Sequence, residues 1–465
     1  MVAMKHLGAI LLFLFPAVVP AAAALYHLNG YVEGLPDREV YLSLYDRSGY
    51  SVIDSAKALN GSFHFMLDER DVPGMYRVYL EEPEKEDQQE AAKYVEFVFN
   101  RESMDIYGQW SDLERSVSIV NSEENRVLQA FKLYENRYED KMRVLQNVFR
   151  QYPADDVFMK AARRQFETLQ RERSAWIDSL TEAHPGLYVS RIIAAYRSVF
   201  IPADMGEAER QEFLKKNYFR EAPIRDTALV HTPVYHYRII EYLMMYRRQG
   251  LSFAEQEQAF MEAVDAIMAN VAPDEELMTY VTDYLIEGFH SFQMEEIQTY
   301  ILDHYVDELC RTDVTEMARE RSEGYRKMAI GETAPDLVVT DRDNRVVTLS
   351  EMDHDYVAVV FWSTDCPHCS GLIPRLAEWY RDDREADLEV IAISIDTVPA
   401  LWEEFLGEHT LPWINANEPL GWKGKAPTDY NVYATPTLFI LNRNREILAK
   451  PFTWRDFRKA VRDLE

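Results

Sequence analysis

Two cysteines that lie three residues apart offer the clearest chemistry in this 465-residue sequence. They occur in Cys366-Pro367-His368-Cys369, between the apolar run 357–362 and a segment with apolar residues at helical spacing. A strand, a C-x-x-C turn and a helix in this order indicate a redox-active dithiol. The unpaired N–H groups at a helix start favour the thiolate of Cys366. Cys369, one turn further on, could then resolve a mixed disulfide formed by Cys366.

The two residues between the cysteines suit the same turn. Pro367 fits the first helical position, because its φ is already helical and it lacks only an N–H that would have no partner there. His368 adds a positive charge or a hydrogen-bond donor beside the nucleophile. We therefore predict that Cys366, Pro367, His368 and Cys369 form the catalytic turn.

Half of a zinc site and a structural disulfide are the alternatives for this pair. Zinc would need about two more ligands, and the sequence holds no second C-x-x-C and no H-x3-H. A disulfide across three residues closes a very short loop and would stabilise the fold little. We expect a redox dithiol that uses neither a metal nor a cofactor.

The composition excludes some classes of partner. The chain has a formal net charge of −29, with 47% hydrophobic and 28% charged residues. These proportions are ordinary for a globular protein, and the length predicts about three domains. Because like charges repel and no basic stripe is present, we expect neither nucleic acid nor an anionic membrane surface as a partner.

The N-terminal residues 1–24 are typical of a secretory signal. Lys5 and His6 precede an apolar stretch, and the segment ends in a run of alanines that offers cleavage near Ala23 or Ala24. We expect an exported, periplasmic protein without stable membrane insertion after cleavage. An uncleaved anchor is the alternative.

The third cysteine, Cys310, lies in a helical pattern that begins at Ile301. A buried cysteine that packs as a small apolar residue is the expectation there. A third redox thiol is the alternative.

Residues 25–118 alternate between apolar and polar in short runs, which predicts half-buried strands and a β-sandwich. Asn60-Gly61 falls between two such runs and predicts a hairpin, because a tight turn of this kind needs positive φ at both central residues.

Residues 119–327 predict a helical domain. The apolar period changes at about Glu123 to spacings of three and four. Four breaks divide the pattern into several helices: Tyr152-Pro153, His184-Pro185-Gly186, Ile201-Pro202 and Ala272-Pro273. A tyrosine-rich stripe around Tyr242 is expected to be core. The domain could hold a client protein or space the redox domain.

Residues 328–465 predict an α/β fold around one sheet. Its elements are the strand 357–362 and the helix after the cysteines, followed by a strand at 388–395, a helix at 399–406, strands at 437–441 and 445–448, and a helix at 454–464. The whole chain is thus expected to be multi-domain, with an all-β sandwich, an all-α domain and an α/β domain in order.

The last of these domains resembles the thioredoxin superfamily, and within it the exported TlpA/ResA-like thiol-disulfide oxidoreductases. The resemblance rests on Phe361-Trp362, the C-x-x-C turn, Pro374 and the segment Tyr430–Ile440. It implies a thioredoxin-like fold, and the β and helical domains resemble accessory regions of multi-domain members.

The resemblance also implies a client-binding set of Trp362, Thr435 and Pro436. Pro436 would be the cis-proline that faces the catalytic turn, with an ordinary trans proline as the alternative. An extended client segment could pair with the Thr435 backbone by strand addition. Two positions depart from the family pattern, because Val360 and Leu372 stand where relatives have buried acids that assist proton transfer. His368, Asp365 or water could take that role.

We expect an enzyme that exchanges disulfides with thiol- or disulfide-containing client proteins and with an upstream redox partner. A reductase or isomerase is favoured over an oxidase, although the Cys-Pro-His-Cys turn is similar to that of DsbA-type oxidases. A thiol peroxidase is a weaker alternative, because Val359 stands where the P-x-x-x-T/S-x-x-C pattern has proline. The other alternative is a non-catalytic protein that binds a partner or senses redox state.

Overall fold

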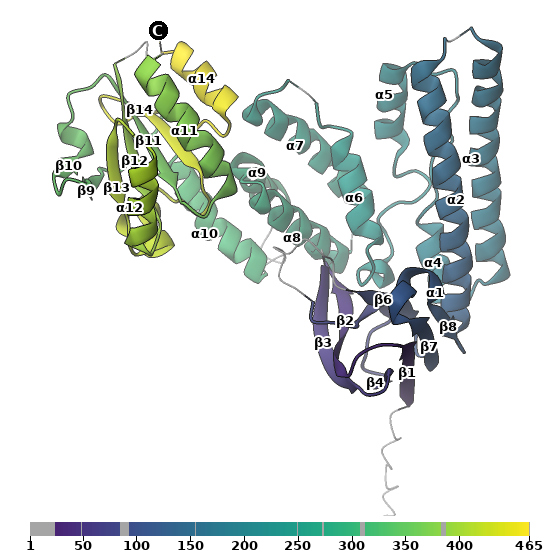
Figure 1. The fold of residues 1–465 in the computed structure, drawn as a ribbon. Helices are drawn as coiled ribbons and strands as arrows, with labels where there is room; N and C mark the ends of the chain where they lie inside the picture. The colour runs from purple at the N-terminus through teal and green to yellow at the C-terminus, as the bar shows by residue number, and fades with distance from the viewer. Residues whose placement is uncertain are drawn as a thin grey trace, which may run out of the picture. The chain divides into compact units, whose positions relative to one another are not determined.

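The computed structural model describes residues 24–47, 49–83, 93–153, 155–248, 250–271, 274–306, 312–382 and 387–464 (Figure 1). Residues 1–23 of the predicted signal segment and Cys310 lie outside these ranges. Among the described residues, no helix is both long enough and apolar enough to cross a membrane.

The chain divides into two compact units. One comprises residues 1–194 with 231–233, and the other comprises residues 195–230 with 234–465. The helical region is therefore shared between the units. The boundaries expected at residues 24, 118 and 327 stay predictions.

The N-terminal strands form a β-sandwich, as the alternating pattern predicts. Within the described residues one sheet has the order β4-β1-β7-β8 and the other β3-β2-β5-β6. Apolar side chains from both sheets meet in one core that includes Leu28, Val40, Phe65 and Phe97. The strands are β1 Leu25–Glu33, β2 Arg38–Asp46, β3 Gly49–Ala58, β4 Ser62–Asp68, β5 Gly74–Tyr79, β6 Tyr94–Phe99, β7 Met104–Gln109 and β8 Ser118–Val120, with the short helix α1 Leu113–Ser116 before β8.

The Asn60-Gly61 turn differs in part from its prediction. Both residues have positive φ, 50° and 80°, as a tight turn requires. However, the flanking strands β3 and β4 belong to different sheets, and the pairing next to the turn is the single bridge between Leu59 and Ser62. The turn therefore passes the chain from one sheet to the other and does not close a regular hairpin.

The helical region begins at Glu123, where the period changes in the sequence. Ser122 caps α2 by accepting a hydrogen bond from the Asn125 N–H at 3.1 Å, and the helix ends just before Tyr152-Pro153. The tyrosine stripe is core, since Tyr235 and Tyr242 are buried. The helices are α2 Glu123–Gln151, α3 Val157–Ala183, α4 Tyr188–Ala194, α5 Glu207–Asn217, α6 Val234–Met244, α7 Phe253–Asn270, α8 Glu275–Ser291, α9 Glu295–Tyr305 and α10 Asp313–Lys327.

The C-terminal part is a thioredoxin-like α/β domain around the sheet β13-β12-β11-β14-β15. Strands β9, β10 and β13 were not predicted, and β15 begins two residues later than expected. The elements are β9 Val338–Thr340, β10 Val346–Thr348, β11 Tyr356–Trp362, α11 Pro367–Asp382, β12 Leu388–Ser394, α12 Pro399–Glu408, β13 Ile414–Asn417, α13 Lys425–Asp429, β14 Thr437–Asn442, β15 Ile447–Ala449 and α14 Trp454–Arg462.

The central strand β11 is apolar throughout because both of its faces are covered. Val360 and Trp362 point into a core shared with α11, α12 and α14. Val359 and Phe361 point into a second core, which includes Tyr430 and residues that follow α10. This double burial holds β11 in the middle of the sheet, and residues 363–365 connect its last residue to Cys366.

A buried ion pair joins α2 to α3 and generates a stability prediction. The Arg173 guanidinium donates to Glu135 through Nε at 2.9 Å and Nη2 at 2.7 Å, and the two side chains are only 10% and 12% exposed. Replacing Arg173 with Met should lower the free energy of unfolding by about 3 kcal/mol, because Glu135 would keep a buried charge without its ion-pair partner. Urea denaturation followed by circular dichroism would measure the change.

Two variants control this measurement. Adding Glu135→Leu to Arg173→Met should restore most of the lost stability, because neither charge remains. On the same helix, Arg171→Met removes an exposed pair with Glu167 and should cost less than about 1 kcal/mol. A loss for Arg173→Met no larger than that for Arg171→Met would contradict the prediction.

Candidate functional site

Three loops meet at one edge of the thioredoxin-like sheet. Strands β11 and β12 are parallel, and their last residues Trp362 and Ser394 are paired. Strand β14 is antiparallel to β11, and its first residue, Thr437, pairs with Phe361. The residues after β11, the residues after β12 and the residues before β14 therefore gather at this edge.

The Cys366 sulfur is held by two backbone groups. Cys366 directly precedes α11, and its Sγ accepts a hydrogen bond from the Cys369 N–H at 3.2 Å, as a helix-capping side chain does. The Cys366 thiol also donates to the Thr435 carbonyl oxygen at 3.2 Å. The Thr435–Pro436 peptide bond is cis, as the sequence resemblance implies. The structure thus brings Cys366, Thr435 and Pro436 together.

Cys369 lies in the first turn of α11 and is fully buried. Burial, together with the hydrogen bond to Cys366, raises the pKa of the Cys369 thiol to about 12, against the opposing influence of the Ser363 N–H. At neutral pH this thiol is therefore protonated in the reduced protein. The two thiols, both free in this structure, differ sharply in exposure, because Cys366 is only partly buried.

A buried carboxylate that the sequence analysis missed supports the turn. Asp396 follows β12, is 5% exposed, and accepts hydrogen bonds from the Ser363 hydroxyl at 2.7 Å and from the Thr364 N–H at 3.1 Å. It also accepts from the hydroxyls of Thr364 at 3.0 Å and Ser394 at 2.6 Å. The sequence does contain a signal for Asp396, because this acid directly follows the buried strand predicted at 388–395.

The two positions where family members carry acids are apolar and packed here. Val360 is completely buried and Leu372 is 9% exposed, both in the core beneath α11. Asp396 occupies neither position, and its partners are Ser363, Thr364 and Ser394. It therefore fixes the backbone before Cys366, including the Ser363 N–H that faces Cys369.

The other predicted site residues differ in how far they reach the surface. Trp362 is 1% exposed, and its ring packs 4.9 Å from that of Phe405, so it belongs to the core and offers no surface to a client protein. The prediction that Trp362 binds a client is therefore not retained. Pro367 begins α11 as predicted, and His368 is exposed on its first turn.

No group of three or more His, Cys, Asp or Glu side chains with the arrangement of a metal site occurs within the described ranges. The site can hold and exchange a disulfide with the sulfur atoms of its own two cysteines. This chemistry requires no bound group beyond the partner thiols.

Two family models match the chain. Residues 330–450 match the AhpC/TSA family, and this range includes the C-x-x-C turn, Asp396 and the cis-proline loop. Residues 26–128 match a domain of unknown function, DUF4369, over the β-sandwich and the start of α2.

Two of the solved structures that match the chain come from Bacteroides. A thioredoxin-like protein from Bacteroides caccae has a TM-score of 0.42 and 21% identity, and the match covers 57% of this chain and 97% of that one. The thioredoxin domain of a thiol-disulfide oxidoreductase from Bacteroides vulgatus has a TM-score of 0.27 and 22% identity, over 29% of this chain and 97% of that one.

Among curated proteins, the thiol-disulfide oxidoreductase ResA of Bacillus cereus is 30% identical over 125 residues, which are 27% of this chain and 70% of that protein. The ResA protein of Bacillus anthracis is 29% identical over 123 residues, 26% of this chain and 69% of its own length. This similarity, on a thioredoxin-like fold with a C-x-x-C turn facing a cis-proline, shows that the chain belongs to the ResA-like thiol-disulfide oxidoreductases of the thioredoxin superfamily.

Proposed function

We propose that Cys366 is the nucleophile that exchanges disulfides with client proteins, and that Cys369 resolves the mixed disulfide. The observation that supports these roles best is the contrast between the two thiols. Cys366 is partly exposed at the sheet edge, with its sulfur next to the Cys369 N–H at a helix N-terminus. Cys369 is completely buried and protonated at neutral pH. A client can thus reach one sulfur and not the other.

The proposed reaction transfers two electrons to the client. The Cys366 thiolate attacks one sulfur of a client disulfide, which forms a mixed disulfide and releases the first client thiolate. Cys369 then passes its proton to a released client thiolate and attacks the Cys366 sulfur, which releases the second client thiolate and leaves a Cys366–Cys369 disulfide. A dithiol partner upstream reduces this disulfide by the same exchange in reverse.

Thr435 and Pro436 are proposed to bind the client. The Thr435 carbonyl oxygen lies 3.2 Å from the Cys366 sulfur, so a client backbone beside Thr435 would bring its own sulfur close to the nucleophile. Strand addition to an exposed backbone segment is a common mode of peptide recognition. Asp396 supports this arrangement from the opposite side of Cys366, because it fixes Ser363 and Thr364.

For direction and compartment we propose a reductase or isomerase that works after export, in the periplasm. The N-terminal segment, with its charged start, apolar stretch and alanine-rich end, supports export. The similarity to ResA supports thiol-disulfide exchange without fixing its direction. His368 beside the nucleophile favours the opposite direction, because stabilising the reduced thiolate makes a disulfide more oxidising.

Trapping of client proteins tests the assignment of the two thiols. The Cys369→Ser variant should accumulate mixed disulfides through Cys366 in cell extracts, because nothing resolves them, and the adducts should disappear with dithiothreitol. The reduced wild-type protein should reduce insulin, and Cys366→Ser should lower that activity to background. Gel electrophoresis without reductant measures the adducts.

The Cys366→Ser/Cys369→Ser variant is the control, since adducts that persist there would come from another thiol. An absence of thiol-sensitive adducts and of insulin reduction would favour a binding or sensing protein. Consumption of hydrogen peroxide by the reduced protein, without insulin reduction, would favour a thiol peroxidase.

The raised pKa of Cys369 predicts an unusual pH dependence. Only the thiolate reacts with an alkylating reagent, and burial favours the neutral Cys369 thiol. The alkylation rate of Cys369 should therefore keep rising about tenfold per pH unit through pH 10. In urea the same cysteine should level off near its ordinary pKa of 9.0. Rates of iodoacetamide labelling, measured for the Cys369 peptide by mass spectrometry, check this. A plateau below pH 9 in the folded protein would contradict it.

His368 is the residue expected to tune the potential. If its imidazole stabilises the reduced form, His368→Ala should lower the reduction potential of the Cys366–Cys369 couple by about 30 mV, a tenfold change in equilibrium constant. Equilibration with glutathione buffers measures the potential. His64→Ala removes another exposed histidine, on β4, and should leave it unchanged. Equal potentials for the His368→Ala protein and wild type would show that His368 is only a surface residue.

A further inference from the structure

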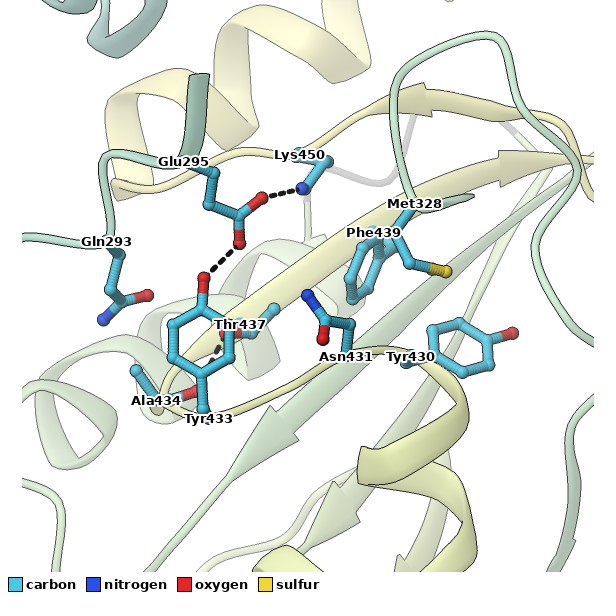
Figure 2. Close-up of a pocket in the computed structure, with 10 residues that line it drawn as sticks. All are labelled: Gln293, Glu295, Met328, Tyr430, Asn431, Tyr433, Ala434, Thr437, Phe439 and Lys450. Atoms are coloured by element: carbon cyan, nitrogen blue, oxygen red, sulfur yellow. Dashed lines mark hydrogen bonds and ion pairs between the residues drawn. The ribbon is translucent and has the colours of Figure 1, made fainter. Parts of the chain in front are cut away.

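Tyr433 lies two residues before Thr435, and a side chain from the helical region holds it in place. The Tyr433 hydroxyl donates to Glu295 Oε1 at 2.6 Å, and the Lys450 ammonium donates to Glu295 Oε2 at 2.5 Å (Figure 2). Glu295 is the first residue of α9, where the unpaired N–H groups of the helix favour a negative charge. One carboxylate therefore binds both the loop before the cis-proline and the residue that follows β15.

Two further helices pack against the same tyrosine. The ring of His290, on α8, lies 5.2 Å from that of Tyr433, and the ring of Tyr325, on α10, lies 5.6 Å away. Burial and the Glu295 charge raise the pKa of Tyr433, so its hydroxyl stays protonated and remains a donor. Tyr433 is thus enclosed by α8, α9 and α10, all of which belong to the same compact unit as the redox site.

The fit between this loop and the helices is close. A Cβ atom at Gly324 of α10 would lie 2.3 Å from the Asn431 side-chain oxygen, so any larger residue there would displace the Asn431 side chain. The cavity between them, lined by Asn431, Tyr433, Glu295 and Lys450 among others, has a volume of about 10 Å³. That is room for about one water molecule. The helices therefore leave the loop little freedom to move.

We propose that Glu295 is a positioning residue for thiol-disulfide exchange: by binding Tyr433, it holds the Thr435 carbonyl against Cys366. The inference rests on the proposed roles of Cys366 and Thr435, and it gives the helical region a part in the chemistry. The route is short. Glu295 fixes the Tyr433 hydroxyl, Tyr433 fixes the backbone through Thr435, and the Thr435 carbonyl accepts the Cys366 thiol hydrogen at 3.2 Å.

The hydrogen bond from the Cys366 thiol to the Thr435 carbonyl predicts the direction in which the reduction potential should change. The Thr435 carbonyl accepts a hydrogen from the thiol, which only the reduced protein has. Loosening the loop should therefore destabilise the reduced form and make the disulfide harder to reduce. It should also speed alkylation of Cys366, because its sulfur would lose the hydrogen bond to the Thr435 carbonyl.

Tyr433→Phe in the full-length protein is the first test, because it removes only the hydroxyl. The equilibrium constant with glutathione should shift about threefold toward the disulfide, a potential lower by about 14 mV. Iodoacetamide should label Cys366 about threefold faster. Glu295→Ala should change the potential and the labelling rate in the same directions. Because Glu295 is partly exposed, this variant can replace Tyr433→Phe if the latter folds poorly.

The double variant separates positioning through Tyr433 from any other influence of Glu295. If both residues act through one hydrogen bond, Tyr433→Phe/Glu295→Ala should shift the potential no more than the larger single change, whereas independent effects would add. Additive shifts would overturn the proposed route.

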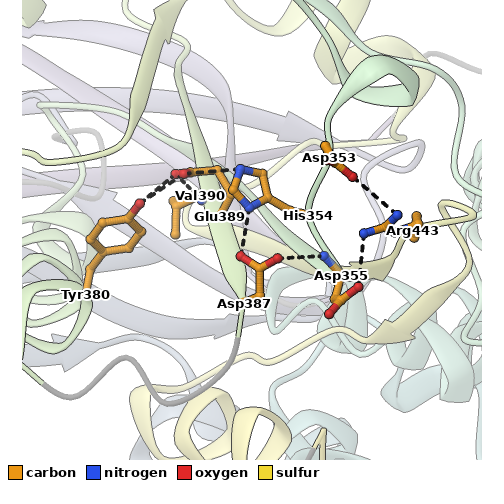
Figure 3. A network of polar contacts seen from close by, with 8 residues as sticks. All are labelled: Asp353, His354, Asp355, Tyr380, Asp387, Glu389, Val390 and Arg443. Atoms are coloured by element: carbon orange, nitrogen blue, oxygen red, sulfur yellow. Dashed lines mark hydrogen bonds and ion pairs between the residues drawn. The ribbon is translucent and has the colours of Figure 1, made fainter.

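Tyr380→Phe is the matched control. Tyr380 is on α11 beyond the catalytic turn, and its hydroxyl donates to the Glu389 carboxylate at 2.9 Å and 3.0 Å (Figure 3). It lies in a polar network with His354 and Asp387 at the opposite edge of the sheet, near the start of β12. Removing this tyrosine hydroxyl should leave the potential and the Cys366 labelling rate at wild-type values.

The outcomes separate this inference from the proposed function. If the wild-type protein reduces no disulfide, the proposed function fails. If the wild type is active but Tyr433→Phe and Glu295→Ala match Tyr380→Phe in potential and labelling rate, the function stands and the positioning role of Glu295 is overturned.

Discussion

The Cys366 sulfur lies between a backbone N–H group of α11 and the backbone carbonyl of Thr435, and the surrounding structure serves to bring those two groups together. Neither group can reach the sulfur unless β11 ends beside β14 and α11 begins directly after Cys366. The pairing of β11 with β14 meets the first condition, and Pro367 at the helix start suits the second. The apolar sheet thus acts as a rigid support for a small polar site at its edge.

Local patterns predicted much of this arrangement. Spacing within a few residues was enough to predict β11, the C-x-x-C turn, the helix after it and the change of period at Glu123. At this range the period of the apolar residues shows which face of a strand or helix is buried. The resemblance to a known family added the cis bond before Pro436, which lies 70 residues from Cys366 and could not follow from spacing.

Residues that depend on distant partners were missed. Glu295 and Tyr433 are 138 residues apart in the chain, and nothing near either one shows that a surface glutamate will meet that tyrosine. Asp396 follows β12 and stands at neither Val360 nor Leu372, the positions of the acids in relatives, so the family pattern does not point to it. The Asn60-Gly61 signal correctly gave the turn geometry, but only the packing of two sheets decides where the following strand pairs.

The burial of Cys369 directly beside Cys366 also bears on how the site withstands oxidants. A peroxide that reaches the partly exposed Cys366 would convert it to a sulfenic acid, which left alone can be oxidised further and irreversibly. Here the neighbouring thiol can condense with the sulfenic acid, releasing water and leaving the Cys366–Cys369 disulfide. Accidental oxidation would then end in the disulfide form, which is one of the two states of the proposed exchange reaction, so the shielded thiol would protect Cys366 from irreversible oxidation.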